Sequence, residues 1–240
     1  MPERTAYRFS WGVGPLTGNL QLLEPVAAIR GRKPKGQGSD RRREILDAAR
    51  DIYLTEGYDQ TTIRKVGQRV GVSSTALYVY FKDKDALIAA VCDEVLEPLT
   101  QAAMSVQAEV AKAQTPQDVE MLLRQFAEGY VRFGLANPMV YFRIFMSQKQ
   151  IAWNHRTGII EGTEQYFVRF NLFGFAVDVI RRGQDLKLFK AGDPVLLTEV
   201  SWAALHGLIS IRVTDPNAPF APLDDQINTL LDMLLLGLKG

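Results

Sequence analysis

Residues 61–84 constrain the fold of this 240-residue chain more than any other stretch, because two apolar patterns of helical period flank one glycine. In the first pattern the apolar residues recur at i, i+3 and i+7, the spacing of one helical face: Ile63, Val66 and Val70. Gly71 follows them, and helices commonly end in a left-handed glycine. The stretch therefore predicts a helix, a tight turn and a second helix.

The second helix of this pair is predicted to begin after Ser73, whose hydroxyl group can cap it. Its inward-facing candidates are Ala76, Leu77, Tyr80 and Phe81. The outward face keeps Ser74, Thr75 and Tyr78. Helices this short must pack on a neighbour, so one interpretation is an ordinary helical hairpin that only buries its apolar face. Small hydroxyl groups, a tyrosine and nearby basic residues favour instead a reader of the DNA major groove.

The flanking segments supply a packing partner and a specific resemblance. Residues 42–56 are amphipathic, and the apolar side carries Ile45, Leu46, Ala49, Ile52 and Tyr53. Downstream, Asp83 can cap a long fourth helix. The ordered residues that match a known pattern are Ile45-Leu46, Ala48-Ala49, Gly57-Tyr58, Thr61-Thr62-Ile63, Gly71-Val72-Ser73, Leu77-Tyr78, Tyr80-Phe81, Lys84 and Leu87. Over residues 40–90 this order resembles the DNA-binding domain of the tetracycline-repressor (TetR) family of transcriptional regulators.

The resemblance implies which residues meet DNA. The start of the second helix of the pair is expected to face the bases, where Ala76 offers only apolar contact to a thymine methyl group. Tyrosine hydroxyl groups and basic residues around it are expected to meet phosphates. The predicted DNA-binding set is Arg41, Arg42, Thr62, Arg64, Ser73, Ser74, Thr75, Ala76, Tyr78, Tyr80 and Lys84. One departure from the family pattern is Gly67, which lies mid-helix where alanine is usual and costs about 1 kcal/mol relative to alanine.

Charge divides the chain in the way that DNA binding by one part would require. Residues 30–90 contain 13 Lys and Arg against 8 Asp and Glu, a net charge of +5, whereas residues 91–240 contain 13 against 17, a net charge of −4. We interpret residues 30–40 as a basic arm that follows phosphates or enters the minor groove; a solvated linker is the alternative. Residues 1–29 are rich in glycine and proline and are predicted to be a disordered extension.

Several functions find little support in the composition. Cys92 is the single cysteine, so an internal disulfide is excluded, and it is expected to be a small buried hydrophobe. With two histidines, we expect no metal site, and no motif indicates a cofactor or a catalytic site. No apolar run reaches the length of a membrane span. We expect a cytoplasmic protein that is not an enzyme.

The rest of the chain is predicted to be helical, so the fold class is all-α. A three-helix domain with a helix-turn-helix over 41–88 is followed by a helical ligand-binding and dimerisation domain over 89–240. The expected helices include 119–135, one that begins at Pro138, 159–182, 195–212 and 223–238. Pro98 is expected to kink or end the first section of the fourth helix, with helix continuing to Gln114.

The last two helices carry more apolar residues than one buried face needs. We therefore predict that they pair across a two-fold axis in a homodimer. The residues concerned are Trp202, Leu205, Leu208, Ile209, Ile227, Leu230, Leu231, Leu234 and Leu235.

Aromatic residues at helical spacing in the second domain are core candidates first and pocket candidates second. Pockets lined by aromatic rings with a few polar groups are typical small-molecule sites. The predicted ligand-binding set is Phe126, Tyr130, Phe133, Tyr141, Phe145, Tyr166, Phe170, Phe173, Trp202 and His206. Two short segments, residues 137–145 and 202–207, also resemble a branch of the family with a Trp-His-Gly signature, although a lone histidine among apolar residues is more often a packed core group.

The resemblance implies a ligand-responsive transcriptional repressor. It is expected to bind a palindromic double-stranded operator as a homodimer and to be released by a small, mainly apolar or aromatic effector. Two alternatives stay open: a helical small-molecule-binding protein or enzyme that keeps the first domain as a scaffold, and a non-specific nucleoid binder.

Overall fold

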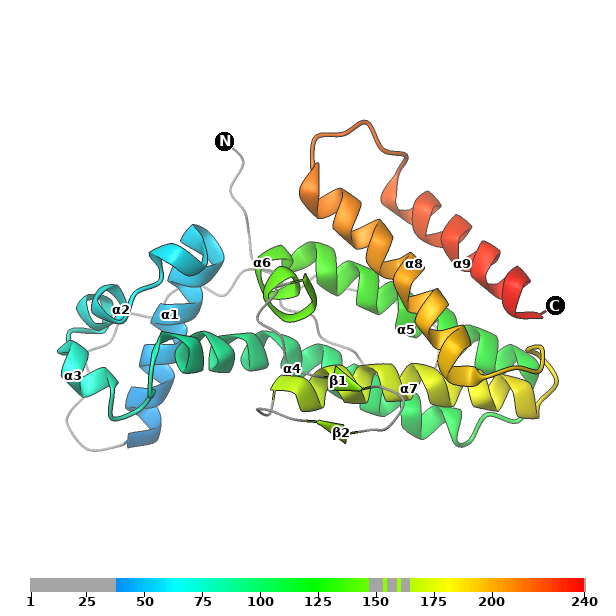
Figure 1. The fold of residues 1–240 in the computed structure, drawn as a ribbon, viewed down its shortest axis with the longest axis horizontal. Helices are drawn as coiled ribbons and strands as arrows, with labels where there is room; N and C mark the ends of the chain where they lie inside the picture. Colours follow the sequence, from blue (N-terminus) through cyan, green and yellow to red (C-terminus); the bar gives the residue numbers. More distant parts are fainter. Residues whose placement is uncertain (1–37, 147–152, 155–158, 161–164, 240) are drawn as a thin grey trace. The chain divides into compact units, whose positions relative to one another are not determined.

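The computed structural model describes residues 38–146, 153–154, 159–160 and 165–239, and the side chains of residues 40–146 and 172–239 (Figure 1). The predicted extension over residues 1–29, and residues 30–37 of the predicted basic arm, lie outside the described residues. Residues 38–40 of that arm are helical, because the first helix begins at Gly38.

The chain divides into two compact units. Of the described residues, unit 1 comprises 38–97 and 139–146, and unit 2 comprises 98–138, 153–154, 159–160 and 165–239. The helices of unit 1 are α1 (Gly38–Gln60), α2 (Ile63–Val70), α3 (Ser74–Leu77), the first part of α4 (Lys84–Val110), most of α6 (Pro138–Tyr141) and the π-helix η1 (Phe142–Met146). Residues 139–146 thus belong to the same unit as the helix-turn-helix, although the sequence analysis assigned them to the second domain.

Unit 1 is built on the apolar face of α1. The five residues predicted for that face are all buried: Ile45, Leu46, Ala49, Ile52 and Tyr53. Gly57 interrupts the helix with φ 86° and ψ −179°, a conformation that a residue with a Cβ rarely adopts. Leu77 and Phe81 complete the core from the other side of the turn, at 0% and 4% exposure. Of the predicted inward positions of the helix pair, Ile63, Val66, Leu77 and Phe81 are buried, whereas Val70, Ala76 and Tyr80 are half-buried.

Gly67 has a steric reason to replace alanine. A Cβ atom at this position would lie 2.8 Å from the carbonyl oxygen of Val72 and 3.5 Å from Cδ1 of Leu77. The turn folds back on α2 at this point, since the Val72 and Gly71 N–H groups both donate to the Gly67 carbonyl oxygen. Glycine is therefore what lets the turn pack closely on its own helix.

The helix α4 begins at Lys84, where Asp83 accepts a hydrogen bond from the Ala86 N–H at 2.7 Å, as the sequence predicted. Pro98 lies inside α4 and does not end it. The helix closes at Val110, four residues before the predicted limit at Gln114.

Unit 2 is a set of helices packed around α5. Its elements are the last part of α4, α5 (Pro116–Ala136), α7 (Gln165–Asp185), α8 (Pro194–Thr214) and α9 (Leu223–Lys239). Thr115 and Asp118 form a capping box at the start of α5. Strands β1 (Trp153–Asn154) and β2 (Ile159–Ile160) pair antiparallel, with Trp153 opposite Ile160. The helix predicted from residue 159 was therefore placed too early, because residues 159–160 are extended and α7 starts at Gln165.

Ion pairs join α5 and α9 at regular intervals. Arg132 contacts Asp224 at 2.6 Å, Arg124 contacts Asp232 at 2.5 Å, and Glu120 contacts Lys239 at 2.6 Å. From one pair to the next, the residue number falls along α5 and rises along α9. The two helices therefore run antiparallel. Beneath these pairs, Leu235 and Leu238 of α9 join the core of unit 2 with Leu122 of α5.

Apart from the two-residue strands, the regular elements of the described chain are helices, which confirms the all-α fold class. One expectation needs correction. Among the described residues, α8 is long and apolar enough to cross a membrane, although a single such helix is weak evidence for a span. Only 17% of that stretch is buried within the protein, and the large apolar side chains that α8 exposes are Leu196, Val200 and Ile211.

Candidate nucleic-acid interface

The α2–turn–α3 segment is fixed by two hydroxyl caps. The Thr62 Oγ1 accepts from the Lys65 N–H at 3.2 Å, and the Ser73 Oγ accepts from the Ala76 N–H at 3.2 Å. Gly71 ends α2 in the left-handed region at φ 73°. Both caps are exposed, so Thr62 and Ser73 lie on the outer surface where the sequence placed them.

Helical hydrogen bonding continues beyond the four residues of α3. The Tyr78 N–H donates to the Ser74 carbonyl oxygen, and the Phe81 N–H donates to the Leu77 carbonyl oxygen at 3.0 Å. Of the predicted base-facing residues, Thr75 is exposed, and Ser74 and Ala76 are half-buried. Of the predicted phosphate-facing tyrosines, Tyr78 is 55% exposed and Tyr80 is half-buried.

Val79 is the residue of this surface that the sequence analysis missed. Its side chain is 81% exposed, between the two tyrosines. It follows Thr75 by four residues, so helical spacing places it on the same outer face. That spacing was the signal available in the sequence. Val79 was assigned to neither face of the predicted helix.

The cations around this surface differ in how firmly they are held. Arg64 is exposed, and Lys65 beside it forms an ion pair with Glu56. Arg41 pairs with Glu44 at 2.7 Å, and Arg42 is exposed with its guanidinium carbon 5.1 Å from the centroid of the Phe81 ring.

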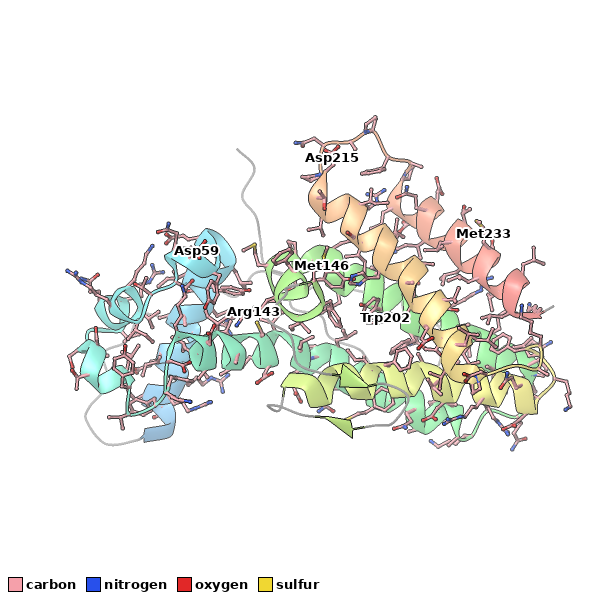
Figure 2. The ribbon with its side chains drawn as sticks, in the orientation of Figure 1. Asp59, Arg143, Met146, Trp202, Asp215 and Met233 are labelled. Atoms are coloured by element: carbon pink, nitrogen blue, oxygen red, sulfur yellow. The ribbon has the colours of Figure 1, made fainter. Side chains whose placement is uncertain are left out.

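Lys84 is half-buried and rests on the protein. Its Nζ atom lies 3.9 Å from the centroid of the Tyr58 ring and 3.4 Å from the carbonyl oxygen of Asp59, which Figure 2 labels. A cation–π contact of this kind holds the ammonium group near the N-terminus of α4.

Asp85 ties residues 139–146 into unit 1. Its Oδ1 atom accepts a hydrogen bond from the Tyr58 hydroxyl group at 2.5 Å and from an Arg143 guanidinium N–H at 2.9 Å. The Arg143 side chain also lies over the Tyr58 ring, with its guanidinium carbon 5.0 Å from the centroid (Figure 2 labels Arg143). A second tie is the Tyr53 hydroxyl group, which donates to the Met139 carbonyl oxygen at 2.9 Å. Arg143 is therefore held by Asp85 and by the Tyr58 ring, both within unit 1.

Cys92 behaves as the small buried hydrophobe that the sequence predicted. Its side chain is fully buried beside Tyr53, and burial raises the pKa of its thiol to about 12. Burial is also the main cause of the raised pKa of the Tyr53 hydroxyl group. Both groups are therefore neutral at physiological pH.

Four residues of the predicted ligand-binding set meet in unit 2. The Trp202 indole N–H donates to the Tyr130 hydroxyl oxygen at 2.9 Å, which joins α8 to α5. The Phe173 ring of α7 meets the Trp202 ring edge-on, with centroids 5.9 Å apart and planes at 74°. The His206 ring lies 5.7 Å from that of Trp202, one helical turn along α8. Trp202, labelled in Figure 2, is the residue that all the others contact.

Of the other six members of that set, two are side chains of α5, two belong to unit 1, and two have side chains outside the described residues. Phe126 packs half-buried against the core of unit 2, and Phe133 is buried at 4% exposure. Tyr141 and Phe145 belong to unit 1, where their ring centroids lie 5.0 Å apart. The backbones of Tyr166 and Phe170 belong to α7, but their side chains lie outside the described residues.

The apolar residues of α8 and α9 divide differently from the prediction. Five of the residues assigned to the dimer face are buried within unit 2, at 0–8% exposure: Leu205, Ile209, Ile227, Leu231 and Leu235. The exposed apolar side chains on these helices are Leu196, Val200, Ile211, Met233 and Leu236. The buried residues form the stripe of each helix that faces the core. The exposed apolar residues form a different stripe on each helix, so they are not the residues that the sequence analysis assigned to the dimer contact.

Comparison with known proteins assigns the first domain. Residues 45–91 match the family described as "Bacterial regulatory proteins, tetR family". Over 63 residues the chain is 43% identical to the HTH-type transcriptional repressor Rv1474c of Mycobacterium tuberculosis. The domain over these residues is thus a TetR-type DNA-binding domain. That alignment covers 26% of this chain and 34% of the repressor, so the chain spans about a third of the curated relative.

Similarity to solved structures extends over most of the chain at the level of the fold. A protein of unknown function from Rhodococcus sp. RHA1 superposes with a TM-score of 0.66 at 20% identity, covering 87% of this chain and 100% of that one. The transcriptional regulator FadR of Bacillus subtilis, solved in complex with stearoyl-CoA, gives a TM-score of 0.60 at 16% identity, covering 82% of this chain and 98% of FadR. Neither likeness identifies a branch of the family, and the Trp-His-Gly interpretation stays a prediction.

Proposed function

We propose that this protein is a TetR-family transcriptional repressor that binds a palindromic operator as a homodimer and releases it when a small, mainly apolar or aromatic effector binds. The observation that carries the proposal is the outer face of the helix-turn-helix. Thr75 and Tyr78, with their hydroxyl groups, and the cationic Arg64 are all exposed on this segment. Such a face offers base-edge contacts at its centre and phosphate contacts at its rim.

The experiment that tests the proposal is selection of bound sequences. The purified full-length protein is incubated with sheared genomic DNA and with a random duplex library, and the retained fragments are sequenced. A repressor enriches one inverted repeat, and its affinity falls steeply with salt. A non-specific nucleoid binder retains DNA without enrichment. A helical protein that only keeps the domain as a scaffold retains none, and either result contradicts the proposal.

Support for the homodimer comes from the outer stripe of α8. Leu196, Val200, Ala203, Gly207 and Ile211 recur at helical spacing, and the three larger side chains are 49–60% exposed. A Cβ atom on Gly207 would meet nothing within 4 Å in the protomer, so the glycine leaves room for another helix. Monomeric proteins rarely leave a contiguous apolar face of this kind in water. We infer that a second copy covers it, and that the protein acts in the cytoplasm, where its DNA lies.

Support for an effector site comes from the ring cluster around Trp202. Rings from α5, α7 and α8 meet there, together with His206 and the hydroxyl group of Tyr130. An apolar ligand inserted among these rings would separate three helices at once. The FadR relative binds an acyl-CoA, which makes stearoyl-CoA the first probe and simple aromatic acids the second.

The effector proposal is tested by titration calorimetry of each probe with and without operator. If effector and operator bind different states, each weakens the other by the same factor, and a coupling of about 1–3 kcal/mol corresponds to roughly 5- to 150-fold. Tyr130→Phe removes the acceptor of the Trp202 N–H without opening a cavity, so it should alter effector affinity and leave effector-free DNA binding unchanged. A probe that binds equally with and without operator is not an effector.

A further inference from the structure

Val79 is the most exposed large apolar side chain of the described residues, at 81%. The next is Leu236, at 77%, which belongs to α9, one of the two helices predicted to form the dimer contact. Val79 belongs to unit 1, where it lies two residues beyond the end of α3. The dimer face of unit 2 therefore does not account for it.

The position of Val79 is set by the turn that follows α3. Thr75 and Val79 are four residues apart, and Tyr78 is three residues from Thr75, so the three side chains share one face. Leu77 and Phe81 anchor the same turn from below at 0% and 4% exposure. The rigid inner side holds the valine outward, and its branched side chain has few rotamers to lose on binding.

The chemistry of valine limits what it can recognise on DNA. It can neither donate nor accept a hydrogen bond, so it makes no favourable contact with a phosphate or with a purine N7, O6 or N6 group. The one apolar feature that base pairs present in the major groove is the C5-methyl group of thymine. Ala76, the other apolar residue of this face, is half-buried and ends at its Cβ atom, so it lies further from the surface than Val79.

We propose that Val79 is a specificity-determining residue that contacts the C5-methyl group of a thymine in the operator. This inference rests on the proposed function, since it needs a sequence-specific complex. Val79 would select thymine at one position of the operator through apolar contact. This selection would add to the hydrogen-bonded base contact proposed for Thr75.

The test replaces thymine by deoxyuridine, which keeps base pairing and removes only the methyl group. An operator obtained by the selection above is resynthesised with deoxyuridine at one symmetric pair of positions at a time, and affinities for the full-length dimer are measured at fixed salt. At the position that Val79 contacts, wild-type affinity should fall about fourfold per methyl group, the ratio expected for loss of one buried methyl. With Val79→Ala, affinity for the thymine operator should fall, and that position should no longer distinguish thymine from deoxyuridine.

Controls separate the possible outcomes. Met104→Ala truncates another exposed apolar side chain, at 53% exposure on α4, and should leave the full thymine dependence in place. Enrichment of no sequence contradicts the proposed function itself. With an operator in hand, equal wild-type affinity for thymine and deoxyuridine at every position overturns the Val79 inference. An unchanged thymine dependence in Val79→Ala overturns it as well, because another residue then reads the methyl group.

Discussion

At the scale of single residues, Gly67 shows how two general preferences compete. Helix propensity favours alanine over glycine inside a helix by about 1 kcal/mol. The carbonyl oxygen of Val72, 2.8 Å from the position of a Cβ atom, opposes that gain because backbone cannot move aside as a side-chain tip can. The sequence showed the first effect and not the second, since the approach of the turn to α2 is visible only in three dimensions.

We expect Gly67→Ala to destabilise the protein by about 1–3 kcal/mol, the usual cost of overpacking. Gly174→Ala is the matched control, because Gly174 also lies inside a helix but its Cβ atom would meet nothing within 4 Å. It should stabilise by up to about 1 kcal/mol. Urea unfolding of both variants measures the difference, and equal stabilisation by the two would show that the turn relaxes without cost.

Cys92 should resist thiol reagents in the folded protein. Its thiol is buried, and a pKa raised to about 12 leaves almost no thiolate at pH 8, the form that reacts. We expect labelling by an aromatic disulfide reagent to be negligible in buffer and complete in denaturing urea. Rapid labelling of the folded protein, with no loss of helical circular dichroism, would contradict the assigned burial.

At the scale of elements, the parts that depend on local chemistry were predictable. The caps at Asp83 and Ser73, and the capping box at Thr115, need only a hydroxyl or carboxylate at the right distance along the chain. The location of residues 139–146 was not predictable, because it depends on Arg143 meeting an acid 58 residues earlier, Asp85. Sequence spacing carries no information about such a contact.

The ion pairs between α5 and α9 predict how unit 2 responds to acid. The hydrogen bond from Lys239 is the main cause of the lowered pKa of Glu120, and the Arg124 guanidinium lowers it further. A lowered folded-state pKa adds stability that is present above the unfolded value of about 4.3 and is lost as pH falls through the folded value. Stability should therefore fall below pH 4.

The variant Glu120→Gln isolates this effect. It should lower stability at pH 7 by up to about 1 kcal/mol, because the pairs are partly exposed, and should be nearly neutral at pH 3. Glu109→Gln is the control, since Glu109 pairs with Lys112 within the same exposed turn. Urea unfolding at both pH values is the measurement. An equal loss at pH 7 and pH 3 would mean that packing, not charge, explains the contribution of Glu120.

At the scale of the whole molecule, the amount of apolar sequence in the last two helices indicated two faces, but not which residue belongs to which face. Leu231 and Leu236 are both leucines of α9, yet the first is 3% exposed and the second 77%. The distinction comes from how α9 packs on α5 and α8, which fixes its rotation about its own axis. A substitution chosen from sequence alone, such as Leu231→Asp, therefore tests the folding of the protomer and not its assembly.

The assembly is tested on the exposed stripe instead. Leu236→Glu places a charge where the isolated protomer is open to water. We therefore expect the helical content to be unchanged and the melting temperature to be close to that of an isolated wild-type protomer. The same charge would be buried in the proposed dimer, at a cost of several kcal/mol, so the variant should sediment as a monomer at micromolar concentration. Operator affinity should then fall towards the non-specific level, because one domain reaches only one half-site.

Met104→Glu, on an exposed position of α4, should remain dimeric. Leu231→Asp should instead unfold the protein. A Leu236→Glu protein that sediments as a dimer would contradict assembly through α9 and leave its apolar stripe to another partner.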